Sequence, residues 1–479
     1  MNEIINRLKA LGYETVDESF YSKIEGWKSW YQGDVAHFHN YRIRTGKTYS
    51  NCKRYSLNMA KKVCEDWANL LMNEKVKITL EGEKEQEFID TVFRDNNFAV
   101  KCNEMQELKA ALGTVAYIPR VVGMQANADG DAVLGTAEKI ALDYITVENI
   151  YPIQWENGYI TECAFGSQRN VNGEKYIYLQ VHAKEADDTY RIENYLFLTS
   201  NGACTQVELS SVRGFERIPP KVYTHDKQRQ FIIDRLNISN NYDYTLPLGV
   251  SVYANSIDVL KGVDIAYDSY VNEFVLGKKR IMVTPAAMQY LENGEPVFDP
   301  DDIVFYVLPE DIKGDNAIQP IDMQLRCGEH NRGINDQLDM LSSKCGFGEN
   351  YYRFEGGSIA TATQIISEQS TLFRSIKKHE VILESVLIEL CRTLLRMGNM
   401  AMNAGLDENV EMSIDFDDSI IEDKGADFAR DLQMLSAGIL NPYEFRMKWM
   451  NEDEETAKEA LPQLDALMQG ATEPQGEVE

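Results

Sequence analysis

The longest helical pattern in the sequence constrains the fold more than any other feature. It covers residues 361–403, and its apolar or neutral side chains keep one stripe, at positions 365, 372, 376, 383, 387, 390, 394 and 397. A helix of that length spans about 65 Å at 1.5 Å per residue. Helices of globular domains average ~12 residues. The pattern therefore indicates a shaft or scaffold rather than the core helix of a compact domain.

A second feature is a pair of helices separated by a small insert. Residues 251–276 follow the helical period, with Ser251 as a candidate N-cap and Gly277 as a stop. The helical period resumes over residues 320–344, and residues 281–319 between the two helices contain strand-like segments. Two long helices can then run side by side, with the β-rich insert at their shared tip.

The rest of the chain mixes helices and strands. Residues 114–222 contain alternating strands separated by turn signals, which predicts an antiparallel meander. Residues 223–248 look irregular, and residues 410–416 look like a strand. Helical periods cover residues 55–72, 83–96, 102–112, 424–437, 441–449 and 454–468. We therefore expect an α+β fold, in which the first of these helices packs in the core rather than on a partner, and a disordered tail at the last ten residues.

The charge of the chain is strongly negative and uneven. The 479 residues carry a net charge of −28, whereas proteins that grip nucleic acid usually carry basic patches. Residues 1–80 have a net charge of +4 and residues 406–479 a net charge of −15, so the two ends meet different surroundings. No run of 18 apolar residues or signal-peptide core is present, and the eight cysteines form no C-x-x-C pair, which is typical of a protein made in the cytosol with reduced thiols.

Motifs for catalysis or metal binding are weak. Gly46-Lys47-Thr48 lacks the glycine that a nucleotide-binding loop needs five residues earlier, where Tyr41 stands. His37 and His39 are too few for zinc and suit an alternating strand or a turn. An acidic turn lacks the calcium-loop spacing and suits solvent exposure; it contains Asp415, Asp417, Asp418, Glu422 and Asp423. Nothing selects a catalytic pair among 76 acidic residues, so the sequence does not favour a carboxylate-dependent hydrolase, and no cofactor or metal is expected.

Several segments, in a specific order over nearly the whole chain, resemble portal proteins of tailed phages, in particular those of siphophages and prophages of Gram-positive bacteria. The matching segments are Trp30-Tyr31, His39-Asn40-Tyr41, residues 59–71, Pro247-Leu-Gly-Val-Ser251, Gly346-Phe-Gly-Glu-Asn-Tyr-Tyr352, Thr361-Ala-Thr-Gln-Ile-Ile-Ser-Glu368, Asp415-Phe-Asp417 and Ala437-Gly-Ile439. Each is modest alone, and their order and spacing carry the likeness.

The resemblance implies a portal fold with an α/β wing, a two-helix stem, a small β-rich clip, a long kinked helix and a helical crown. The boundaries that we expect are 1–248 for the wing, 249–280 and 320–345 for the stem, 281–319 for the clip, 346–360 for a tunnel loop, 361–404 for the long helix and 405–479 for the crown with its acidic tail. It also implies a homo-oligomeric ring, typically of about twelve subunits, at one vertex of a capsid.

The resemblance also implies function and partners. Double-stranded DNA would pass the ring without sequence-specific contacts, and an acidic wall suits passage rather than grip. The expected partners are the terminase large subunit, the head–tail adaptor, and the major capsid and scaffolding proteins, in the virion and in the host cytoplasm during assembly, with no membrane. Without a nucleotide-binding loop the force would come from the terminase. The alternative is another structural head component of a phage-like particle, which includes the portal of a defective prophage.

Candidate site residues follow from these parts. Candidates for facing DNA are Lys278, Lys279, Arg280, Arg326, Arg332, Lys344, Asn350, Tyr351, Tyr352 and Arg353. Each basic residue could equally be a solvated or inter-subunit charge, and Tyr351 and Tyr352 could line the bore or pack between subunits. Candidates for binding the terminase and adaptor in the clip are Glu292, Asn293, Asp299, Asp301 and Asp302.

Overall fold

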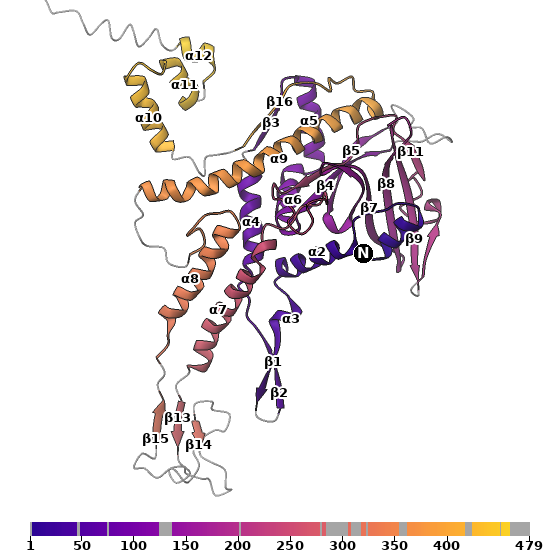
Figure 1. Cartoon of the computed structure of the whole chain (residues 1–479). Coiled ribbons are helices and arrows are strands. Elements are labelled where there is room, and N and C mark those ends of the chain that lie inside the picture. Colours follow the sequence, from indigo (N-terminus) through magenta and orange to yellow (C-terminus); the bar gives the residue numbers. More distant parts are fainter. Residues whose placement is uncertain are drawn as a thin grey trace, which may run out of the picture. The chain divides into compact units, whose positions relative to one another are not determined.

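The computed structural model of the chain (Figure 1) forms two compact units, Met1–Phe416 and Asp417–Glu479. It describes residues 2–45, 48–73, 76–123, 137–200, 203–277, 280–283, 305–307, 318–321, 324–353, 362–416, 424–450 and 452–459. Among these described residues, helices make up 47% and strands 25%, which agrees with the expected α+β class.

The first unit begins with short helices and a two-stranded ribbon. These elements are α1 (Asn2–Ala10), α2 (Glu18–Tyr31), α3 (Ala36–His39), β1 (Asn40–Thr45), β2 (Thr48–Lys53) and α4 (Met59–Leu71). The Asp17 carboxylate accepts a hydrogen bond from the Ser19 amide and so caps α2. In α4 the side chains of Val63, Cys64 and Trp67 are buried, so the amphipathic stripe faces the core.

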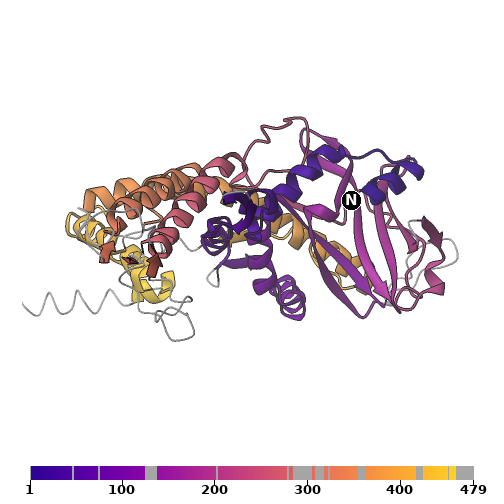
Figure 2. The same ribbon diagram turned by 90° about the horizontal axis from the view of Figure 1, so that it is seen from below.

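Two antiparallel sheets follow. The first has the order β12-β4-β5 and the second the order β10-β9-β8-β7-β6, with β11 also on β9. Their strands are β4 (Thr114–Val122), β5 (Lys139–Thr146), β6 (Ile150–Glu156), β7 (Tyr159–Val171), β8 (Glu174–Lys184), β9 (Tyr190–Ser200), β10 (Ala203–Val207), β11 (Lys221–Tyr223) and β12 (Ile232–Arg235). The meander is confirmed, and Figure 2 shows its long strands beside one another.

The irregular structure expected over residues 223–248 is wrong at β12. This strand pairs with β4, and its Asp234 is fully buried. Asp234 accepts hydrogen bonds from Lys109 Nζ at 2.9 Å and Gln106 Nε2 at 2.8 Å. Asp234 interrupts the alternation of apolar and polar residues in this four-residue strand, so the sequence pattern did not indicate a strand. The residues that stabilise its charge lie on another element and cannot be identified from the local sequence.

The long helix is α9 (Ala362–Met402), within two residues of its expected bounds. It packs on α4, on α5 (Glu83–Asp95) and on β4, β5 and β12. Leu383, Leu387, Leu390 and Leu394 on its stripe are fully buried. The expectation of a shaft outside the core is therefore wrong for this part of α9, because its apolar side chains cover the first sheet. The side chain of residue 365 lies outside the described residues.

Helix α6 (Phe98–Leu112) turns into β4 through Gly113, which has a φ of +90°. A Cβ atom at Gly113 would lie 2.6 Å from the carbonyl group of Gly249. Only glycine fits this close approach between the turn from α6 into β4 and the segment that leads into the next helices. A further two-stranded pair, β3 (Lys77–Leu80) and β16 (Met412–Asp415), closes this unit.

The two expected helices are α7 (Ile257–Leu276) and α8 (Cys327–Lys344), and they pack against each other (Figures 1 and 2). Helix α7 starts later than expected because Ser251 is buried and its hydroxyl donates to the Ala110 carbonyl, so Ser251 is not the N-cap. A short 3-10 turn, η3 (Ala254–Ser256), precedes α7 instead. Gly277 ends α7 as expected.

The insert between α7 and α8 contains a three-stranded sheet. Its strands are β13 (Arg280–Val283), β14 (Phe305–Val307) and β15 (Ile318–Ile321). Strand β13 pairs with β14 in parallel and with β15 in antiparallel orientation. Pro320 lies opposite Ile281 in this sheet, so the helix expected from residue 320 begins only at Cys327. Proline is tolerated there because β15 is an edge strand.

The second unit contains α10 (Lys424–Ser436), α11 (Pro442–Met450) and α12 (Glu454–Glu459). Phe445 packs against Phe428 and Trp449 at ring-centroid distances of 5.4 and 6.4 Å. Asp431 accepts hydrogen bonds from Lys448 and Trp449 and joins α10 to α11. Residues 460–479, which include the end of the expected last helix and the expected disordered tail, lie outside the described residues.

All eight cysteines are free thiols. Six are buried, and burial raises the pKa of each of them, to about 12 for Cys102, Cys345 and Cys391. Cys52 in β2 and Cys327 at the start of α8 are partly exposed. Within the described residues, no helix is both long and apolar enough to cross a membrane.

Candidate functional site

A polar clamp joins the end of α7 to the start of α8, on either side of the insert. Arg326 Nη2 lies 2.8 Å from Glu273 Oε2, and Arg326 Nε donates to Glu273 Oε1 at 3.0 Å. The hydrogen bonds from Arg326 lower the pKa of Glu273 from 4.5 to about 2. His330 Nε2 lies 3.4 Å from the same carboxylate. The clamp brings the two ends of the insert together.

The other basic candidates on α8 differ in their surroundings. Arg332 is exposed, and among the described residues it has no hydrogen-bond or ion-pair partner. Lys344 Nζ donates to the Asn255 carbonyl at 3.2 Å, and Arg353 pairs with Asp339 at 2.9 Å. Arg326 is 67% exposed but already paired. Of these four cations, Arg332 is therefore the one whose charge is not used inside the described part of the chain.

The remaining predicted site residues are placed only in part. Arg280 begins β13 opposite Ile321, and its side chain lies outside the described set. The glycine-rich loop is the expected tunnel loop, residues 346–360, and its last part, residues 354–360, lies outside the described residues. So do Lys278 and Lys279 and the insert candidates Glu292, Asn293, Asp299, Asp301 and Asp302.

The described part of the glycine-rich loop packs on α4. Tyr352 is buried, and its hydroxyl donates to Asp66 Oδ2 at 2.7 Å while its amide donates to Ser342 Oγ. The ring of Tyr352 therefore packs inside its own chain, whereas lining a bore and packing between subunits were the two alternatives expected for it. Burial beside Asp66 raises its pKa above the ordinary value.

Two neighbours of Tyr352 complete this arrangement. Phe347 is buried against Trp67 at a centroid distance of 5.1 Å, and Tyr351 stacks on Phe347 at 4.5 Å. Tyr351 remains 39% exposed, so it is the tyrosine of the pair with surface left for a contact. Asn350 has a φ of +65°, a left-handed conformation that asparagine tolerates in tight turns.

A polar cluster that sequence reasoning missed joins α7 to the segment after the ribbon. Asp264 in α7 accepts hydrogen bonds from the Leu57 amide at 2.8 Å, from Ser56 Oγ at 3.0 Å and from His39 Nε2 at 3.1 Å. The Val35 amide donates to His39 Nδ1, which places the imidazole proton on Nε2. Asp268, one turn later, accepts from the Tyr55 amide. The sequence did contain a signal for this cluster, namely two aspartates four residues apart among the apolar positions of one helix.

The residues considered for metal binding do not converge. His37 and His39 lie in the helical turn α3, and Asp415 pairs with Lys77 in the β16–β3 ladder. The other members of the expected acidic turn, Asp417, Asp418, Glu422 and Asp423, and also Gly46 and Lys47, lie outside the described residues. Among the residues that the structure describes, no group of three His, Cys, Asp or Glu side chains could hold a metal ion.

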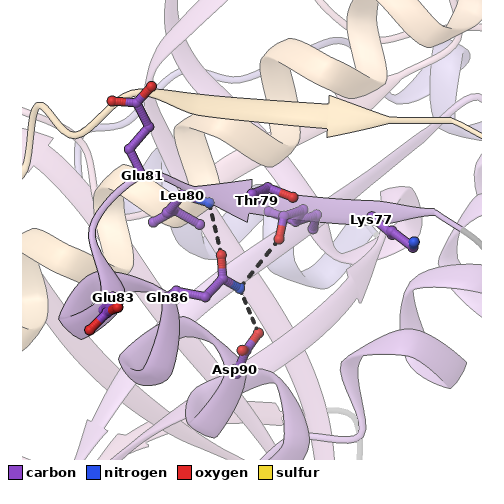
Figure 3. A pocket seen from close by; sticks show the side chains of 8 residues that line it. Lys77, Thr79, Leu80, Glu81, Glu83, Gln86 and Asp90 are labelled. Atoms are coloured by element: carbon purple, nitrogen blue, oxygen red, sulfur yellow. Dashed lines mark hydrogen bonds between the residues drawn. The ribbon is translucent and has the colours of Figure 1, made fainter. Parts of the chain in front are cut away.

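A depression beside β3 is lined by polar side chains, and Gln86 among them is bonded to the edge of the strand (Figure 3). Gln86 Oε1 accepts from the Leu80 amide, and Gln86 Nε2 donates to the Ile78 carbonyl and to Asp90 Oδ1. The side chain thus caps the outer edge of β3 in place of another strand. The polar groups of Gln86 serve the strand edge rather than an open reaction centre.

The chain belongs to a phage portal family. The family model described as "Phage portal protein, SPP1 Gp6-like" matches residues 13–468. Portal proteins of this kind are structural components of phage particles, in which they form an oligomeric ring that contacts head and tail components. The resemblance inferred from the sequence is therefore confirmed at the level of the family.

One similar solved structure is titled "Neck of native GTA particle computed with C12 symmetry". The sequence identity is 9% and the TM-score 0.40, over 81% of this chain and 88% of that chain. No curated protein matches this chain.

Proposed function

We propose that this chain is the portal vertex subunit of a tailed phage or prophage. About twelve copies form a ring-shaped channel through which double-stranded DNA is packaged and later ejected. The observation that carries this proposal is the family match over residues 13–468. The clamped pair of α7 and α8 around a small sheet is consistent with it.

The parts of the chain take the roles of the portal domains in this proposal. Residues 1–248 form the wing, 249–280 and 320–345 the stem, 281–319 the clip, 346–360 the tunnel loop, 361–404 the long wing and crown helix, and 405–479 the crown. The clip docks the terminase motor and then the head–tail adaptor. The wing and crown meet the major capsid and scaffolding proteins, and the ring stands at one vertex of the virion after assembly in the host cytoplasm.

Transport of DNA requires contacts that are weak and independent of sequence. A net charge of −28 per copy repels phosphate from most of the wall, and a few cations hold the duplex near the axis. Arg332 is our first candidate for such a contact, because its charge has no partner among the described residues. Arg326, Lys344 and Arg353 would first have to leave Glu273, Asn255 and Asp339. The subunit itself hydrolyses no ATP, and the terminase supplies the force.

The mass and shape of the purified full-length chain test the proposal. Light scattering should give a particle near twelve times 54.6 kDa, and negative-stain images should show a ring with a central hole. A compact monomer that persists at high concentration would contradict the portal function.

The channel role of Arg332 needs a separate test. Arg332→Gln should lower the fraction of DNA-filled heads while the ring still assembles, because only a contact to the moving duplex is removed. Arg213→Gln, at another exposed arginine in the proposed wing, is the matched control and should leave filling unchanged. Equal filling of both variants would remove Arg332 from the channel contacts.

A further inference from the structure

Most side chains of the β1–β2 ribbon are exposed in the described part of the first unit. Figure 1 shows the ribbon leaving the helical body at α3. Apart from each other, the strands have their main contacts at the base, where β1 meets α3. The exposed fractions of Ile43 and Tyr49 are 48% and 69%. A two-stranded ribbon with both faces in water is at best marginally stable. We therefore expect another surface to cover part of this ribbon.

The strand register gives the ribbon two different faces. Residues directly opposite each other share a face. Tyr41 pairs with Cys52 and Ile43 with Ser50, so the strand residues of this face are uncharged and partly apolar, and Arg54 at the base lies over the Tyr41 ring. The other face is basic, with Arg42 opposite Asn51, Arg44 opposite Tyr49 and Lys53 opposite Asn40. Within the described residues, Lys53 lies 4.0 Å from the Asp34 carboxylate, and Arg44 has contacts of its own.

The base of the ribbon is held firmly. The Arg54 guanidinium donates to the Phe38 carbonyl at 2.7 Å and lies over the rings of Phe38 and Tyr41, at 4.3 and 5.0 Å. The residues that follow are fixed to α7 by Asp264 and Asp268. A ribbon with a fixed base and uncovered faces is suited to docking, because little orientational freedom remains to be lost on binding.

The charge of this segment identifies the partner. Residues 35–64 contain seven Lys and Arg and no Asp or Glu, within a chain whose net charge is −28. The rest of the chain therefore presents a surface of opposite charge, and a ring brings that surface of the next copy alongside each subunit.

We propose that the β1–β2 ribbon is an inter-subunit arm that docks on an acidic surface of the neighbouring copy of this chain. The uncharged face with Tyr41, Ile43 and Cys52 forms the centre of this contact, and the cations around Arg42 pair with carboxylates at its rim. The inference rests on the proposed ring and deepens it. DNA is the weaker occupant, because a phosphate backbone leaves the uncharged face with Ile43 uncovered.

Photo-crosslinking identifies the occupant directly. In the assembled full-length ring, p-benzoylphenylalanine in place of Ile43 should give crosslinks between two copies of this chain. The same photo-reactive residue in place of Tyr244, which is 91% exposed and lies outside the ribbon, is the control and should give at least tenfold less of this product. A ring that forms without crosslinks from position 43, or with crosslinks to DNA or to another protein, overturns the inference.

A second measurement uses the stability of the ring. Ile43→Ser should raise the concentration at which the ring dissociates by about tenfold or more, and Arg42→Glu should do so most strongly at low salt. The folded content of the dissociated variants, followed by circular dichroism, should match the wild type. Unchanged dissociation of both variants contradicts the arm. A wild-type chain that forms no ring contradicts the proposed function as well as this inference, so the two failures are distinguishable.

Discussion

Replacement of Asp264 is the strongest test of how the ribbon is joined to α7. We predict that Asp264→Ala loosens the segment from Tyr55 to Leu57 without unfolding the chain. The variant removes one acceptor and leaves three donors without it, namely the Leu57 amide, the Ser56 hydroxyl and His39 Nε2. His39 and Asp264 are both almost fully buried, so water does not replace the lost partner freely.

The magnitude follows from these three donors. Each buried donor left without an acceptor costs about 1–3 kcal/mol, and removal of one member of a buried charged network costs about 3–5 kcal/mol. A loss of about 3 kcal/mol in the local opening free energy raises the opening constant roughly 150-fold. Amide hydrogen exchange at Leu57 measures this constant, because its amide donates to Asp264.

Asp258→Ala is the matched control on the same helix. The Asp258 side chain is 94% exposed, and its ion pair with Lys261 lies on the surface, so exchange at Leu57 should stay near the wild-type rate. If Asp264→Ala changes that rate by less than threefold, the cluster does not fix the base of the ribbon and the reasoning is refuted.

Three further predictions concern other contacts of the first unit. Arg326→Gln should lower the thermal midpoint at pH 7. Because Arg326 depresses the pKa of Glu273 from 4.5 to about 2, the difference from wild type should shrink as the pH falls below 4.5 and vanish only below pH 2, and a pH-independent difference would contradict this prediction. Gly113→Ala should destabilise the chain more than Gly12→Ala in thermal unfolding. Both glycines have positive φ, but only at Gly113 would a Cβ atom lie against the Gly249 backbone. Equal losses of stability would show that the close approach to Gly249 contributes nothing. Lys109→Met should lower the free energy of unfolding in denaturant by about 3–5 kcal/mol, because Asp234 remains buried and charged. The Lys109→Met, Asp234→Leu double variant should recover part of that loss. A double variant as unstable as the sum of both single changes would argue against an interaction between the two residues.

Local patterns predicted the helices well where a stripe of side chains is buried by the fold. The bounds of α9 follow from its apolar period, and Gly277 ends α7 as its sequence indicates. The start of α7 was wrong, because a hydroxyl that suits a helix cap is used by the Ala110 carbonyl instead. Strand β12 was missed since its central Asp234 is stabilised by Lys109, 125 residues away in the sequence.

The candidate site shows the same division. The sequence lists the basic residues near the insert, but it does not show which of them are neutralised, because Glu273 and Arg326 are 53 residues apart. Tyr352 and Asp66 are 286 residues apart, and only the fold reveals that this tyrosine belongs to the interior. The resemblance of ordered segments therefore indicated the family and the list of candidates, whereas pairing over long sequence distance decides which candidates keep an unpaired charge among the described residues.

The distribution of thiols makes the native chain suited to spectroscopic labelling. Six cysteines are buried thiols of raised pKa that react slowly, whereas Cys52 and Cys327 are partly exposed. One of these two stands in the ribbon and the other at the start of α8, beside the clamp. A maleimide fluorophore or spin label would therefore report on both regions in a chain from which no native cysteine has to be removed.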